Sequence, residues 1–171
     1  MKGMKKIILI PLLLSVFLLS GCMIHFNFNG NDTSKPEIQS ENTQNANTTI
    51  KNMSIYIPER FEKNENNSAL YSYYDSELGE SLNIYVGNRE FDNIEKEIKD
   101  IYSSVDATTE YKTYSGYDIA VTEYKDYNKS GFNLFHKTYD FFVDDKIYEV
   151  TFASPFGTFS DDEIIKTISF K

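Results

Sequence analysis

The chain has 171 residues, with 13 Tyr, 13 Phe and no Trp, and a formal net charge of −9 at neutral pH. The acidic excess argues against nucleic acid as a partner, because phosphate binding needs a surplus of Lys and Arg. A single cysteine excludes a disulfide within one molecule, and two histidines are too few for a His/Cys metal site or for Cys-His catalysis. We therefore expect no metal and no cofactor.

The N-terminal segment has the parts of a secretory signal. Three lysines precede an apolar run over residues 7–19, which is too short for a hydrocarbon core that takes roughly 20 residues to cross. The run ends in Leu19-Ser20-Gly21-Cys22, which resembles the lipobox of bacterial lipoproteins. The resemblance implies cleavage between Gly21 and Cys22, diacylation of Cys22, and a lipid anchor on the outer face of the bacterial cytoplasmic membrane. The alternatives are an ordinary cleaved signal peptide or an uncleaved N-terminal membrane segment.

Residues 22–49 are predicted to be a flexible tether. The segment is rich in Asn, Ser, Thr and Gln and has few apolar side chains to offset the entropy of ordering. The predicted domains are therefore a signal peptide over residues 1–21, the tether over residues 22–49 and one folded domain over residues 50–171. The leader holds three of the 17 basic residues and none of the 26 acidic ones, so the mature part has a formal charge of −12.

The folded domain begins with three predicted strands and a helix. Alternating apolar residues predict strands over residues 53–57, 69–74 and 82–86. Apolar residues spaced i, i+4, i+7 and i+8 then predict a helix over residues 93–103, with Asp92 as its N-cap.

Four further strands and a second helix complete the domain. The strands are predicted over residues 108–114, 117–124, 132–143 and 146–153. Ser160 and Glu163 form a capping-box pattern that begins a short helix burying Ile164, Ile165 and Ile168. Because the connections have hairpin length, the predicted fold class is α+β, with a single, mostly antiparallel sheet of about six to seven strands covered by helices.

This order of elements resembles the PsbP-like family over residues 50–171. The likeness rests on packing and turn motifs, namely Ile55-Tyr56-Ile57-Pro58, the mid-chain helix, Lys146-Ile147-Tyr148-Glu149-Val150-Thr151-Phe152 and the closing Asp162-Glu163-Ile164-Ile165-Lys166-Thr167-Ile168-Ser169-Phe170. The resemblance implies an α/β/α sandwich with a mostly non-enzymatic role, docking on a membrane complex or acting as an accessory factor. It brings no set of functional residues to this sequence.

The sequence contains no recognisable catalytic constellation. It has no G-x-S-x-G elbow, no P-loop and no H-E-x-x-H motif. Turn chemistry and helix capping explain the acidic groups at Asp140, Asp144 and Asp145 and at residues 161–163, although paired carboxylates also serve calcium sites and glycosidases. His136 is interpreted as a partly exposed strand residue. We predict that the protein is not an enzyme.

A concentration of tyrosines around one predicted hairpin is the remaining pattern. An exposed group would offer a large contact area with polar tips for a glycan or a protein; its members are Tyr111, Tyr114, Tyr117, Tyr124 and Tyr127. The alternative is that the rings pack under helices and over strand surfaces. The leading hypothesis is a non-catalytic, lipid-anchored adaptor or accessory subunit of an envelope complex, with an envelope protein as its partner. The second is a glycan- or small-ligand-binding lipoprotein that uses this tyrosine-rich surface.

Overall fold

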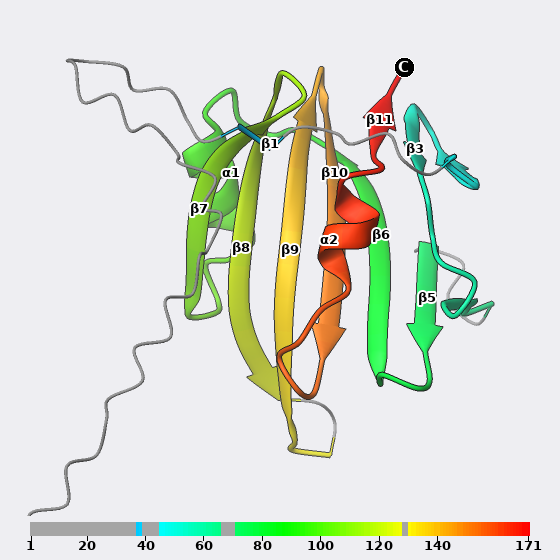
Figure 1. Cartoon of the computed structure of the whole chain (residues 1–171). Helices are drawn as coiled ribbons and strands as arrows, with labels where there is room; N and C mark the ends of the chain where they lie inside the picture. Colours follow the sequence, from blue (N-terminus) through cyan, green and yellow to red (C-terminus); the bar gives the residue numbers. More distant parts are fainter. Residues whose placement is uncertain (1–36, 39–44, 66–70, 128–129) are drawn as a thin grey trace, which may run out of the picture. The chain divides into compact units, whose positions relative to one another are not determined.

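Strands dominate the computed structural model of the chain (Figure 1). It describes residues 37–38, 45–65, 71–127 and 130–171, all of them within the unit Ser34–Lys171. The predicted signal peptide, its cleavage site at Gly21 and the lipidation site at Cys22 lie outside the described residues. The elements are β1 (Glu37–Ile38), β2 (Thr48–Ile50), β3 (Met53–Ile55), β4 (Glu62–Lys63), β5 (Tyr71–Asp75), β6 (Glu80–Asn88), α1 (Ile94–Ile101), β7 (Ala107–Tyr114), β8 (Tyr117–Tyr127), β9 (Asn133–Val143), β10 (Lys146–Ser154), α2 (Asp161–Ile165) and β11 (Ser169–Phe170).

The larger sheet is mostly antiparallel, as predicted. In the described part of the chain it has eight strands in the order β1-β7-β8-β9-β10-β6-β5-β4, and only the β1–β7 pair is parallel. The four strands predicted after the mid-chain helix correspond to β7 to β10. The β9–β10 hairpin pairs from Val143 opposite Lys146 to Phe135 opposite Ser154. This hairpin therefore forms the centre of the sheet, with β8 and β6 on either side.

The expectation of a single sheet is wrong. Strands β2, β3 and β11 form a second, three-stranded sheet, and the segment predicted as the first strand of the main sheet belongs to it. Met53, Ser54 and Ile55 are all buried, so β3 does not have the one wet face that an alternating pattern predicts. The apolar face of the larger sheet needs more cover than a five-residue helix supplies, and this small sheet adds Ile50, Met53 and Ile55 to it.

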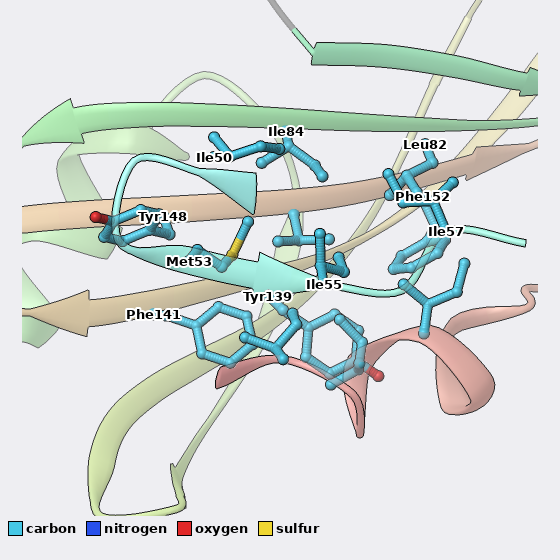
Figure 2. Close-up of a cluster of buried hydrophobic side chains, with 14 of the residues drawn as sticks. Ile50, Met53, Ile55, Ile57, Leu82, Ile84, Tyr139, Phe141, Tyr148 and Phe152 are labelled. Carbon is cyan, nitrogen blue, oxygen red and sulfur yellow. The ribbon is translucent and has the colours of Figure 1, made fainter. Parts of the chain in front are cut away.

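The main core lies between the larger sheet and a layer made of the small sheet and α2 (Figure 2). Figure 2 shows Met53 and Ile55 among Phe141, Phe152 and Ile84 of the larger sheet. Helix α2 joins the same cluster through its isoleucines, and the hydroxyl of Tyr114 donates to the carbonyl oxygens of Ile165 and Ile168 at 2.8 and 2.9 Å. Strand β7 is thereby tied to the carboxyl end of α2.

Helix α1 packs on the opposite face of the larger sheet. Its Ile98 forms a second cluster with Ala120, Phe142 and Ile147, and Tyr102 packs against it. Figure 1 shows α2 in front of the strands and α1 behind them. The two helices thus lie on opposite faces, but one is short and shares its face with a sheet. The predicted covering of the sheet by helices is therefore met only in part.

Both predicted helix caps need correction. The N-cap of α1 is Asn93 rather than Asp92, because the Asn93 Oδ1 accepts the Lys96 N–H at 2.9 Å. Ser160 is the N-cap residue of α2 but makes no side-chain cap bond. Its hydroxyl donates instead to Glu80 Oε2 at 2.7 Å, and its N–H donates to Glu80 Oε1 at 2.9 Å. A long-range contact with a buried carboxylate replaces the local cap.

Ordered structure begins inside the segment predicted as a tether. Strands β1 and β2 both fall within residues 22–49 or cross its end. Asn47 makes two bonds to one residue, since its Nδ2 donates to the Ile57 carbonyl at 2.7 Å and its Oδ1 accepts the Ile57 N–H at 2.9 Å. These bonds complete the backbone pairing next to β2, so the folded unit starts before residue 50.

Candidate functional site

The face of the larger sheet that carries α1 holds polar groups beside its small apolar cluster. Because side chains alternate along a strand, the residues between the core positions of β10 and β6 point to this face, away from the main core. In the β10–β6 register, Glu149 lies opposite Tyr85 and Ile147 lies opposite Gly87. These four residues form the floor of a cavity with a volume of about 480 Å³. A Cβ on Gly87 would lie 2.9 Å from Cε1 of Tyr85, so the tyrosine ring extends over the glycine.

Helix α1 and the loop after β6 form the walls of this cavity. They contribute three carboxylates, Glu90, Glu97 and Asp100, and the apolar side chain of Ile101. Together with Glu149, four acidic residues line the cavity, and none of its described lining residues is Lys, Arg or His. We call this cavity the acidic pocket. Its size is within the range of small-molecule sites, and its lining combines carboxylates with the apolar side chains of Ile101 and Ile147.

Glu97 fixes one wall of the acidic pocket. Its carboxylate is buried and accepts the N–H of Glu90 at 3.1 Å from both oxygens and the N–H of Phe91 at 2.6 Å. The carboxylate therefore ties the loop after β6 to the first turn of α1. Such a wall is preorganised, because both its backbone and its side chain are held before any ligand arrives.

A pair of carboxyl groups lies at the base of this region. Asp140 of β9 is directly opposite Glu149 of β10, and Asp140 is fully buried. The Tyr102 hydroxyl, at the end of α1, donates to Asp140 Oδ2 at 3.1 Å, whereas Asp140 Oδ1 has no hydrogen-bond partner in the described part of the chain. The Thr151 hydroxyl donates to Glu149 Oε1 at 3.0 Å. Asp140 is therefore a sheet residue beneath α1, and its assignment to turn chemistry is wrong.

Burial changes the acidity of both carboxyl groups. Desolvation raises the pKa of Asp140 well above its ordinary value, and the nearby charge of Glu149 raises it further. Desolvation also raises the pKa of Glu149, against the opposing effect of the Thr151 hydrogen bond. Two acids facing each other at low dielectric resist simultaneous ionisation, so they favour a shared proton or a neighbouring cation.

His136 lies further along the same face of the sheet. Its ring stacks on Tyr124, with centroids 4.5 Å apart and planes 1° from parallel. Burial lowers the pKa of His136, so the ring is held toward its neutral form. The side chain is half-buried, which agrees with the prediction of a partly exposed strand histidine.

The five tyrosines predicted as a binding surface do not form one surface. Tyr114 is fully buried in the main core and Tyr117 packs on Phe170 beside it. Tyr111 and Tyr124 lie on the α1 face, whereas Tyr127 is exposed at the far end of β8. Strand alternation divides these residues between two faces, and the length of β8 separates them further.

The residues of the acidic pocket were not predicted as a site. They lie in elements that the sequence predicts, Tyr85 and Glu149 in strands and Glu97 and Asp100 in the helix over residues 93–103. One signal was present in the sequence, because Glu149 is a carboxylate between Tyr148 and Val150 in a strand predicted to be central. Where an element covers that face, the carboxylate is buried and needs a proton, a hydrogen-bond donor or a cation.

Comparisons with known proteins inform the fold only. No family model matches the chain, and no curated protein matches it. Among solved structures, a protein of Bacteroides thetaiotaomicron VPI-5482 is similar, with a TM-score of 0.55 and 17% sequence identity. The match covers 70% of this chain and 45% of that one, so the chain spans less than half the length of its structural neighbour. At this identity the likeness supports a shared fold and carries no activity.

None of the helices in residues 37–38, 45–65, 71–127 and 130–171 is long and apolar enough to cross a membrane. In the same ranges, no three His, Cys, Asp or Glu side chains are placed to hold one metal ion. The carboxylates of the acidic pocket are thus distributed around its walls rather than gathered at one point.

Proposed function

We propose that the chain is a bacterial lipoprotein whose extracytoplasmic domain binds a small polar ligand in the acidic pocket without catalysing a reaction on it. The observation that carries this proposal is the pocket itself, a cavity of about 480 Å³ with a floor formed by β10 and β6, the half-exposed Tyr85 on that floor and a wall fixed by Glu97. Preorganised concave sites that combine apolar surface with polar groups are the usual form of small-ligand sites.

The proposal includes the finer PsbP-like assignment of the domain. Helices on opposite faces of a mostly antiparallel sheet support an α/β/α relationship, and the likeness over residues 50–171 supports the family. The small sheet formed by β2, β3 and β11 departs from a simple two-helix cover. The position of the pocket between α1 and the sheet does not depend on the family assignment.

Substitution of Cys22 tests the anchor. Cys22→Ala is expected to remove the attached diacylglycerol and to shift the protein from the membrane fraction to the soluble or unprocessed fractions, because two acyl chains give an effectively permanent anchor. Intact-mass spectrometry of the membrane-extracted protein measures the lipid directly. Ser20→Ala, which keeps a small residue before the cleavage site, is the matched control. Unchanged membrane retention of the Cys22→Ala protein contradicts the anchor.

A second candidate function is that of an adaptor that binds another protein. Exposed apolar side chains at one end of the larger sheet favour this function. Leu78 in the β5–β6 turn, Phe156 after β10 and Tyr127 at the end of β8 are 49%, 74% and 65% exposed. The β5–β6 turn and the loop after β10 adjoin, because a Cβ on Gly79 would lie 3.9 Å from the Phe156 ring. Clustered exposed apolar residues of this kind are typical of protein contact sites.

A photo-crosslinking residue placed at position 85 or at position 156 separates the two functions in living cells. Ligand binding predicts a small mass adduct at position 85 and no abundant protein adduct at position 156. The adaptor function predicts one dominant protein adduct at position 156. A crosslinker at position 62, on the exposed strand β4, supplies the background for both. Equal adducts at all three positions would remove support from either function.

A further inference from the structure

The acidic pocket carries an inference about the chemistry of its ligand, which depends on the proposed ligand-binding function. Four of its lining residues are carboxylates, one is Tyr85, and none of those described is basic. Two basic side chains adjoin the pocket and bind other groups. Lys146 Nζ donates to Asn88 Oδ1, at the edge of the pocket, at 2.6 Å and to Asp145 Oδ2 at 2.9 Å. The guanidinium of Arg89 donates to the carbonyl oxygens of Asp144, Phe91 and Asp92. The negative charge of the pocket is therefore not neutralised from within by its own lining.

A second observation is independent of the lining. Asp140 is fully buried, extends from the same sheet face as Glu149 toward α1, and leaves Oδ1 without a partner among the described residues. A buried carboxyl oxygen without a partner has a cost, which a cation bound beside Glu149 would reduce. Asp140 thus places a second, buried carboxyl group directly beside Glu149.

The arrangement of the charges distinguishes between kinds of cation. The acidic side chains come from different walls, Glu149 from β10, Glu97 and Asp100 from α1 and Glu90 from the loop after β6. The same lining includes the apolar surface of Ile101, Ile147 and the ring of Tyr85. A metal ion requires oxygens that converge on one point, which the described side chains do not supply. Separated carboxylates that share a cavity with apolar surface match separated ammonium groups joined by methylene chains.

We infer that the acidic pocket binds an aliphatic di- or polyamine, with its ammonium groups on Glu149, Asp100 and Glu90 and its methylene chain along Ile101, Ile147 and the Tyr85 ring. Tyr85 contributes twice, since its face attracts a cation and its area covers the chain. Glu97 holds the wall and keeps its carboxylate on the backbone N–H groups of Glu90 and Phe91.

Calorimetric titration of the full chain, purified in a neutral detergent, with spermidine tests this inference. We expect saturable binding, and we expect Asp100→Asn and Glu149→Gln each to weaken it by about tenfold, the loss typical of one charge-assisted contact. Tyr85→Ala is expected to weaken it without a change of charge. Glu62→Gln on the exposed strand β4 removes an equal charge elsewhere and should leave the affinity unchanged.

Four outcomes contradict the inference in different ways. Equal weakening by Glu62→Gln and Asp100→Asn would show general attraction to an acidic protein rather than a site. Tighter binding of Ca²⁺ alone, with displacement of spermidine, would assign the pocket to a metal. A neutral sugar that protects residues 85–101 from hydrogen exchange, where spermidine does not, would refute the polyamine but keep the ligand-binding function. Failure of every probe to protect these residues would refute both.

Discussion

Phe141→Ala is expected to lower the free energy of unfolding by about 3–5 kcal/mol, among the largest costs of a single core truncation. Phe141 is fully buried at the centre of the larger sheet. Its ring meets Tyr114 edge-on at 5.3 Å between centroids and Phe170 at 5.6 Å. These two partners belong to β7 and to β11 of the small sheet, so one ring joins both sheets and the neighbourhood of α2.

Urea unfolding followed by circular dichroism measures this effect. Tyr127→Ala is the matched control, because it truncates an aromatic side chain of the same sheet that is 65% exposed, and surface changes of this kind are usually within about 0.5 kcal/mol. A cost for Phe141→Ala of less than about 1.5 kcal/mol would mean that the small sheet does not pack on the larger one as described. Loss of cooperativity would mean that the two sheets unfold separately.

Strands β5 to β10 of the larger sheet were predictable because their pattern is local, whereas the two-residue strands β1 and β4 were not predicted. In β9 and β10, apolar residues such as Tyr139, Phe141 and Val150 recur at every second position, and short turns impose antiparallel pairing. The helix over residues 94–101 was predictable for the same reason, since Ile94, Ile98 and Ile101 mark one face.

The second sheet was not predictable, because it depends on contacts between distant segments. Strand β3 pairs with β11 through Ser54 opposite Ser169, more than a hundred residues later, and no local pattern specifies that register. The same applies to Ser160, whose sequence context predicts a cap but whose hydroxyl binds Glu80 across the fold. Tertiary partners compete with local ones for polar groups, and here the tertiary partner is preferred.

The acidic pocket shows a related limit. The alternation of side chains along β10 places Glu149 on the face away from the main core, and this alternation can be read from the sequence. The sequence did not reveal that α1 lies over that face, and it did not reveal the register that brings Asp140 opposite Glu149. The predicted tyrosine-rich surface does not form for a similar reason. The number of aromatic residues in a hairpin does not say which face of the sheet each ring occupies.

Asp140→Asn is expected to flatten the dependence of stability on pH. The folded-state pKa of Asp140 is raised above the value of an unfolded Asp, which is about 3.9. Between these two pKa values the folded state binds more protons than the unfolded state. The contribution of Asp140 to the free energy of unfolding is therefore fully present below about pH 4 and is lost as pH rises through the folded-state pKa. The loss for one group approaches about 1.4 kcal/mol per pH unit. Glu149 acts in the same direction.

Asparagine removes this titration while keeping an acceptor for the Tyr102 hydroxyl and adding a donor beside Glu149. Relative to the natural chain, the variant should be more stable at pH 8 and nearly equal at pH 4, as measured by urea unfolding across that range. Glu62→Gln, on exposed strand β4, removes an acid without burial and should leave the slope unchanged. If Asp140→Asn were equally destabilising at both pH values, Asp140 would be charged and paired in the folded state. Because Glu149 lines the acidic pocket and lies opposite Asp140, a polyamine bound there should raise stability most at pH 8, where these two acids would otherwise cost most.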